Sequence, residues 1–261
     1  MDNRESRNTD YSRRLYIDLL IKVICNTIYE DPTMEPWATE PVYDSTKRET
    51  GLDWPRVAHS MAGVARITNV AQLAEEIIRT NVKGNFIETG VWRGGCCILM
   101  RGILKAYEDA DRKIFVCDSF QGLPKPDAEK YSADKDDPHH KYSELAVSKD
   151  KVSANFERYG LLDEKVVFVE GFFEKTLPYL DTGPLALLRL DGDMYGSTIV
   201  ALESLYSKLS PGGFCIIDDY GAVPACRQAV TDFRTKYGID APMNTIDWTG
   251  VWWQRPVSSS D

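Results

Sequence analysis

Residues 86–100, FIETGVWRGGCCILM, decide the fold, because a short apolar run ends there in an acid and a glycine and then passes directly into a helical pattern. Glycine at the end of a strand permits a tight turn and a close approach of ligand to backbone, and the following helix presents free N–H groups. Gly90, Gly94 and Gly95 are therefore candidates for a cofactor-binding turn. The alternative is that these glycines only pack a helix against a sheet.

The acids near this turn indicate which cofactor it holds. The glycine spacing is not the GxGxxG pattern of dinucleotide-binding proteins, and Glu88 would repel a pyrophosphate but attract an ammonium group. Asp118 ends the next apolar run, where a carboxylate commonly accepts hydrogen bonds from both ribose hydroxyls. A ribose together with an ammonium group points to S-adenosylmethionine.

Apolar runs alternate with helical patterns over the rest of the chain, which is typical of a mainly parallel sheet covered on both faces. The expected strands are, in order, NFIETGV, KIFVCDS, KVVFVEG, PLALLRLDGD, GFCIIDDY, MNTIDW and GVWWQR. The last two are joined by a Thr-Gly turn and predict an antiparallel hairpin at one edge. We therefore expect a Rossmann-like α/β fold with a seven-stranded sheet.

The length of 261 residues, 43% of them hydrophobic, favours one globular domain with additions. The charged residues 1–14 are expected to form a disordered tail, and residues 15–80 an N-terminal helical cap. Residues 81–256 would form the catalytic domain, and residues 257–261 a second tail. Residues 121–150 are too long and too polar for an ordinary connection, and they follow the carboxyl end of a strand, so they predict a lid.

Charge and hydropathy exclude two kinds of partner. The net charge of −9 opposes binding to nucleic acid, which needs clustered Lys and Arg. The longest early apolar segment, LYIDLLIKVICNTIY, is interrupted by Asp18 and Lys22, so it is too polar to span a membrane. We therefore expect a cytoplasmic protein. Its six cysteines show no CxxC pair and are expected to be buried free thiols, with a structural zinc site as the alternative.

Four carboxylates follow two neighbouring strands of the expected sheet. Asp191 and Asp193 end one apolar run, and Asp218 and Asp219 end the next. Their convergence at one sheet edge is costly unless a cation or a shared proton relieves the repulsion. Oxygen ligands suit a hard ion, so the cluster predicts a Mg²⁺ site.

Several segments together resemble the TylF/macrocin O-methyltransferase family. They are ETGVWRGG, CDSFQGLP, NFERYGLLDEKVVFVEGFFEKTLP, LRLDGDMYGST, LSPGGFCIIDDYG and GVWWQR, and the resemblance covers about residues 15–255. It implies a class I, metal-dependent methyltransferase that modifies a deoxysugar in antibiotic biosynthesis, on a finished glycoside or on a nucleotide carrier. Residues 34–51, MEPWATEPVYDSTKRETG, and the lid depart from the family pattern, so the sugar and its carrier are not predicted.

The resemblance also implies roles for individual residues. Asp191, Asp218 and Asp219 would hold Mg²⁺, and Asp193 would be the general base, with Asp191 or a lid histidine as the alternative. The residues implied to bind the cofactor are Ser60, Met61, Glu88, Gly90, Arg93, Asp118, Ser119, Gly171, Phe172 and Phe173. The lid histidines His139 and His140 are expected to be solvated, the alternative being that one contacts the substrate.

We therefore expect a small sugar-containing substrate as the partner, and we expect the chain to form at least a dimer. Three other functions remain open at this point. A catechol-type O-methyltransferase would use the same cofactor and metal. A nicotinamide dehydrogenase would have the same kind of sheet but would carry a GxGxxG motif. A non-catalytic module that binds sugar through a metal would lack affinity for S-adenosylhomocysteine.

Overall fold

The strand that precedes the glycine turn lies in the middle of a seven-stranded sheet of order β3-β2-β1-β4-β5-β7-β6. The computed structural model describes residues 3–257. The strands are β1 Asn85–Thr89, β2 Ile114–Asp118, β3 Val166–Glu170, β4 Leu185–Leu190, β5 Leu209–Ile217, β6 Asn244–Thr245 and β7 Val251–Gln254. The first five are parallel, while β7 pairs antiparallel with β5 and β6. The predicted fold, including the hairpin at one edge, is confirmed.

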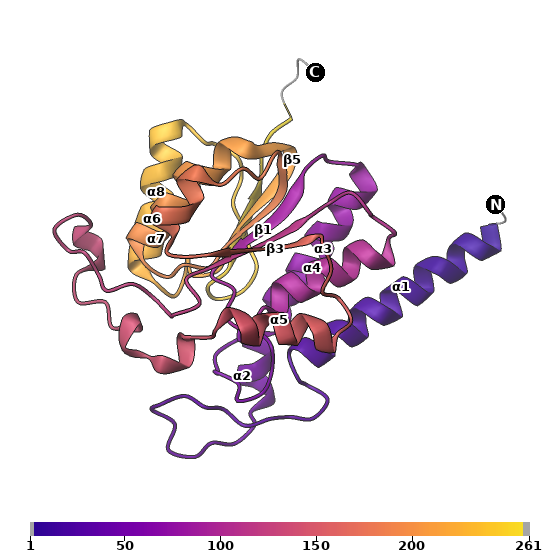
Figure 1. Cartoon of the computed structure of the whole chain (residues 1–261), viewed down its shortest axis with the longest axis horizontal. Helices are drawn as coiled ribbons and strands as arrows, with labels where there is room; N and C mark the ends of the chain where they lie inside the picture. Colours follow the sequence, from indigo (N-terminus) through magenta and orange to yellow (C-terminus); the bar gives the residue numbers. More distant parts are fainter. Residues whose placement is uncertain (1–2, 258–261) are drawn as a thin grey trace.

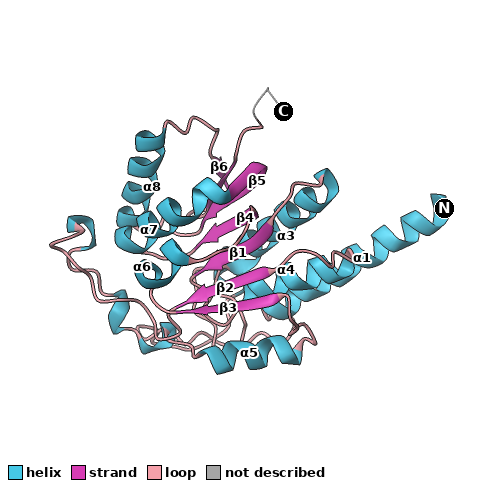
Figure 2. Cartoon of the chain, turned by 45° about the horizontal axis from the view of Figure 1, so that its top comes forward, coloured by secondary structure: helices cyan, strands magenta, loops and turns pink. Residues whose placement is uncertain are grey.

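Helices cover both faces of this sheet (Figure 2). One face packs against α1 Asn3–Ile24, α3 Gly63–Thr80, α4 Gly95–Ala106 and α5 Lys149–Arg158, and the other against α6 Phe173–Thr176, α7 Tyr195–Leu205 and α8 Pro224–Tyr237. The short helix α2 Ser45–Thr50 and the 3₁₀ turns η1 Ser132–Asp134, η2 His139–Lys141, η3 Ser143–Leu145, η4 Leu177–Tyr179 and η5 Tyr206–Lys208 complete the structure. No helix within residues 3–257 is both long and apolar enough to cross a bilayer.

Successive side chains along each strand point to opposite faces of the sheet and pack into two separate hydrophobic cores. In β1, Phe86 packs into the core beneath α1, α3 and α4, while Ile87 packs into the core beneath α7 and α8. In β4, Leu187 and Leu188 divide in the same way. All six cysteines are buried and free, as expected.

The N-terminal segment corrects one prediction. Helix α1 begins at Asn3, so residues 3–14 do not form a disordered tail; residues 1–2 lie outside the described part. The charged segment continues a helix whose face with Ile17, Leu20 and Ile24 is buried. Arg13 adds a contact there, because its Nε donates to the carbonyl oxygen of Ala106 at 2.9 Å. Tertiary packing thus extends a helix that its composition alone would not sustain.

The cap between α1 and α3 is organised around the buried Arg48. Its guanidinium forms ion pairs of 2.9 Å with Asp31 and with Asp53, and it also donates to the carbonyl oxygen of Cys25. One buried cation therefore ties the end of α1 to two loops of the cap. Gly51 and Trp54, on either side of Asp53, line the cavity described below. The cap loops lie at the bottom of the view in Figure 1.

Candidate active site

A cavity of about 450 Å³ opens at the carboxyl ends of the central strands. It is the place where open α/β sheets bind ligands. Among the predicted site residues, those that line it are Met61, Gly90, Asp118, Ser119, Phe172, Phe173, Asp191, Asp193, Asp218 and Asp219. Its wall is completed by lid residues such as Leu123 and His139 and by Trp54, Arg66 and Trp248.

The glycine turn is required by close packing of the backbone. Gly90 has a φ of 82°, and a Cβ there would lie 1.7 Å from the carbonyl oxygen of Asp191. A Cβ at Gly95 would lie 2.5 Å from the carbonyl oxygen of His59. Gly90 lines the cavity, whereas Gly94 and Gly95 pack against neighbouring segments. Gly94 and Gly95 therefore fit the packing alternative, whereas cofactor binding at Gly90 stays a prediction.

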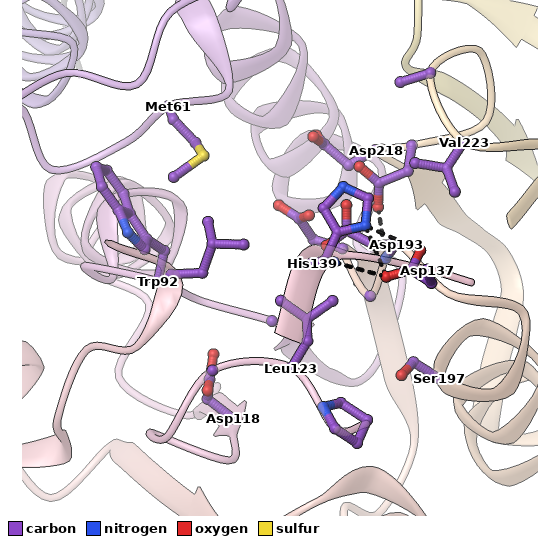
Figure 3. A pocket seen from close by; sticks show the side chains of 18 of the residues that line it. Met61, Trp92, Asp118, Leu123, Asp137, His139, Asp193, Ser197, Asp218 and Val223 are labelled. Carbon is purple, nitrogen blue, oxygen red and sulfur yellow. Dashed lines mark hydrogen bonds and ion pairs between the residues drawn. The ribbon is translucent and has the colours of Figure 1, made fainter. Parts of the chain in front are cut away.

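At one end of the cavity Asp118 is fixed by the backbone (Figure 3). Its carboxylate oxygens accept hydrogen bonds from the N–H groups of Val91 at 2.8 Å and Phe120 at 2.7 Å. Burial raises the pKa of Asp118, and these hydrogen bonds oppose that rise. Each carboxylate oxygen keeps a second lone pair, so Asp118 can accept two further hydrogen bonds from a ligand.

At the other end, Asp191, Asp193 and Asp219 bring carboxylate oxygens within 4.8 Å of one another. Burial and the neighbouring carboxylates raise the pKa of Asp191 and of Asp219 well above the usual range. Asp193 adopts a left-handed φ of 56°, and its N–H donates to Oδ2 of Asp219 at 3.0 Å. A cation can displace the protons that such carboxylates otherwise retain, and an oxygen-only donor set suits a hard divalent ion.

Two buried guanidinium groups neutralise part of this charge. Arg189 of β4 pairs with Glu88 at 2.5 Å, with Asp191 at 2.8 Å, and with one oxygen of Asp218. Arg66 of α3 pairs with the other oxygen of Asp218. Each carboxylate oxygen of Asp218 therefore has an arginine partner. The three carboxylates that lie closest together, here called the compact trio, are those of Asp191, Asp193 and Asp219, and they do not include Asp218.

The lid places a histidine opposite these acids. His139 lies half-buried on the cavity wall, so the expectation that it is solvated is wrong. Its Nδ1 lies 3.0 Å from both carboxylate oxygens of Asp137, and this hydrogen bond raises the pKa of His139. Figure 3 shows the pair facing Asp193. His140 does not line the cavity.

Four predicted cofactor-binding residues, Ser60, Glu88, Arg93 and Gly171, do not line the cavity. The carboxylate of Glu88 is enclosed between Arg189 and the thiol of Cys97, which lies 2.8 Å away. The guanidinium of Arg93 donates to the carbonyl oxygens of Pro55 at 3.0 Å and Ala58 at 2.8 Å. Glu88 and Arg93 thus lie outside the cavity, and each holds neighbouring groups in place through its own hydrogen bonds and ion pairs.

Comparison with known proteins identifies a methyltransferase family whose model matches nearly the whole chain. The family model described as Macrocin-O-methyltransferase (TylF) matches residues 13–255. The chain belongs to this family. It is an O-methyltransferase, as are its relatives.

Two relatives of the TylF family illustrate the similarity. An 8-demethyl-8-(2,3-dimethoxy-alpha-L-rhamnosyl)-tetracenomycin-C 4'-O-methyltransferase of Streptomyces olivaceus is 47% identical over 253 residues, which cover 97% of each chain. A demethyldecarbamoylnovobiocin O-methyltransferase of Streptomyces niveus is 46% identical over 253 residues, covering 96% of this chain and 97% of that one. The solved structure of the O-methyltransferase NovP, 46% identical, superposes with a TM-score of 0.90 over 94% of this chain and 100% of that chain.

Some cavity residues of this TylF-family chain were not predicted from its sequence. Arg66 stands beside Ile67 and Val70 in the buried part of α3, and a charged residue among apolar neighbours is the signal that could have identified it. Trp54 and Trp248 lie in irregular segments, where no periodic pattern indicates which way a side chain points. Their placement depends on tertiary structure alone.

We expect the lid to be anchored by Asp134. This buried carboxylate accepts hydrogen bonds from the N–H groups of Tyr195 at 2.6 Å and Gly196 at 2.8 Å, at the start of α7. Replacement of a capping acid by alanine costs about 0.5–2 kcal/mol. Asp134→Ala should therefore speed hydrogen exchange of residues 127–145 by about 2- to 30-fold, whereas exchange in the exposed control Lys135→Ala should stay unchanged. Equal exchange in both variants would contradict this anchor.

Proposed function

We propose that this chain transfers the methyl group of S-adenosylmethionine to a hydroxyl of a deoxysugar on a glycosylated natural product, with Mg²⁺ as a second cofactor. The observation that carries the proposal is that one cavity joins Asp118 to the acid cluster of Asp191, Asp193 and Asp219. In this proposal a ribose acceptor and a cation site lie at the two ends of one cavity. The relatives named for methylation of a rhamnosyl-tetracenomycin, of a novobiocin precursor and of mycinamicin III support the sugar acceptor.

In this proposal the cofactor, which supplies the methyl group, lies along β1 and β2. Asp118 accepts hydrogen bonds from the ribose, with Gly90 and Ser119 beside it. Phe172 and Phe173 lie next to the adenine, and Met61 next to the methionine end. Glu88 does not contact the cofactor in this proposal. It forms an ion pair with Arg189, which in turn pairs with Asp191 and so fixes the position of that carboxylate. Ser60, Arg93 and Gly171 shape the backbone of the same wall.

The residues of the acid cluster fit a divalent cation. Desolvation and neighbouring carboxylates raise the pKa of the half-buried Asp191 and of the buried Asp219. Asp218 keeps a free lone pair on each oxygen beside its arginine partners. We therefore assign Asp191, Asp218 and Asp219 as ligands. A bound Mg²⁺ would lower the pKa of a coordinated sugar hydroxyl and orient it.

Asp193 is the residue we assign as general base. Burial raises the pKa of Asp193, so the carboxylate accepts a proton readily. Its N–H is held by Asp219, which fixes its position beside the ligands. The lid residues Asp137 and His139 line the opposite side of the cavity, and His139 opposes part of the rise in the pKa of Asp193.

Turnover with a panel of acceptors tests the function. We expect labelled methyl transfer from S-adenosylmethionine to deoxysugar glycosides in the presence of Mg²⁺. The panel also contains nucleotide deoxysugars and catechols, because a catechol-type enzyme would use the same cofactor and metal. Labelling of a catechol but of no glycoside would overturn the sugar assignment.

The metal assignment predicts that turnover depends on Mg²⁺, and that substitution of a ligand and substitution of the base change different kinetic parameters. EDTA should abolish turnover, and added Mg²⁺ should restore it, while affinity for S-adenosylhomocysteine in calorimetry changes little. Asp219→Asn removes a charged ligand and should raise the Mg²⁺ concentration for half-maximal activity about 10-fold or more, because even the loss of an outer-shell partner of a ligand weakens a metal site by about 10- to 100-fold. Asp193→Asn should instead lower kcat about 100-fold at an unchanged Mg²⁺ requirement.

A third substitution in the same assay decides the role of Asp218. If Asp218 is a ligand, Asp218→Asn raises the Mg²⁺ requirement as Asp219→Asn does. A changed Mg²⁺ requirement in Asp193→Asn but not in Asp218→Asn would make the compact trio the metal site. Full activity in EDTA would remove the metal from the reaction.

We also propose that two copies of the chain associate through α1. The helix extends beyond the rest of the molecule (Figure 1), and Leu15, Leu19 and Val23 form an apolar stripe along it that is 52%, 55% and 37% exposed. Residues four apart lie on one face of a helix, so the stripe is continuous.

Sedimentation velocity tests this association. We expect a dimer or larger for the wild-type chain and a monomer for Leu19→Glu, because a buried unpaired charge opposes association. Arg14→Glu, which adds negative charge away from the stripe, is the matched control and should keep the wild-type mass. A monomeric wild-type chain would exclude the proposal.

A further inference from the structure

Three aromatic side chains meet at the edge of the cavity although they are distant in sequence. The rings of Trp37 and Trp54 lie 4.9 Å apart, those of Trp54 and Tyr142 5.4 Å apart, and those of Trp37 and Tyr142 5.8 Å apart, all edge to face. Two belong to the cap and the third to the lid. None of the three belongs to either hydrophobic core of the described chain, and Trp37 is 56% exposed.

The cluster is continuous with the active-site cavity. Trp54 lines the cavity itself, and Tyr142 packs its ring against that of His139, which also lines it, at 6.3 Å. The backbone holds the two tryptophan segments together, since the N–H of Met34 donates to the carbonyl oxygen of Trp54 at 2.7 Å. A ligand that leaves the acid cluster toward the cap therefore meets these rings.

The charges around the cluster determine what kind of ligand fits there. Among the described residues that line the cavity, Arg66 is the one guanidinium, and it is already paired with Asp218 and Asp247. Trp37 also lines a second hollow, whose charged lining residues are Glu35, Glu40, Asp44, Asp53 and a single lysine, Lys47. Both sides would repel a diphosphate, whereas uncharged apolar rings would gain contact with the aromatic faces.

We propose that Trp37, Trp54 and Tyr142 form an aromatic clamp that binds the uncharged, flat ring system to which the methylated sugar is attached. The inference rests on the proposed function, which places the sugar at the acid cluster. A cavity of about 450 Å³ must hold the cofactor and the sugar, so the attached ring system lies at the mouth, between cap and lid. The clamp thus joins Trp37 of the cap and Tyr142 of the lid to Trp54, which lines the cavity.

The clamp is tested with two glycosides of the deoxysugar that the turnover panel identifies, a naphthyl glycoside and a methyl glycoside. Trp37→Ala should raise KM for the naphthyl glycoside about 10-fold with kcat within about 2-fold, because an aromatic contact of this kind contributes mainly to binding. KM for the methyl glycoside should stay unchanged. Trp37→Phe should retain most of the affinity, and Tyr179→Ala, which removes an aromatic ring that is 85% exposed elsewhere, should behave as wild type.

A binding measurement keeps the test independent of turnover. Naphthyl fluorescence reports binding of the naphthyl glycosides of several deoxysugars in the presence of S-adenosylhomocysteine and Mg²⁺. Weaker binding to Trp37→Ala without any turnover by the wild type would leave the clamp standing and overturn the proposed reaction. An equal rise of KM for both glycosides would show that Trp37 only fastens the lid. Unchanged binding, or none to the wild type, would overturn the clamp.

Discussion

A single buried guanidinium holds the acidic end of the sheet together. Arg189 is 1% exposed and lies in register beside Glu88 of β1, and it also binds Asp191 and Asp218, which follow β4 and β5. Burial alone would lower the pKa of Arg189, but the carboxylates around it raise the pKa well above the usual range. The charge therefore stays on Arg189, and three strand ends are fixed relative to one another.

The arginines do not balance the acids that surround them. Among the described residues, six carboxylates, those of Glu88, Asp191, Asp193, Asp218, Asp219 and Asp247, have only Arg66 and Arg189 as arginine partners. Desolvation and repulsion by the neighbouring carboxylates raise the pKa of Asp191 and of Asp219 well above the usual range. A site with this excess of negative charge attracts a divalent cation and repels phosphates, so the same imbalance favours a metal and disfavours a nucleotide-bound sugar.

The sequence predicts those features that follow from strand direction. Asp118, Asp191 and Asp219 each follow a buried parallel strand, and parallel strands bring their carboxyl ends to one edge. It does not predict which partner a polar side chain meets across the sheet. Glu88 turns to the same face as Phe86, where its partner Arg189 is 101 residues away, so no local pattern distinguishes a structural ion pair from a ligand contact.

The remaining cavity residues belong to segments without periodicity, and their placement follows from single tertiary contacts. Asp134 fixes the lid to α7, and Arg48 fixes the cap to α1. Through these two anchors the lid and cap bring Tyr142 and Trp37 together, beside acids that the sheet holds separately. The ion pairs of Arg189 involve no residue of either loop, so a change of sequence in the loops leaves these ion pairs in place. In our proposal the sheet therefore holds the acids, while the loops recognise the attached ring system.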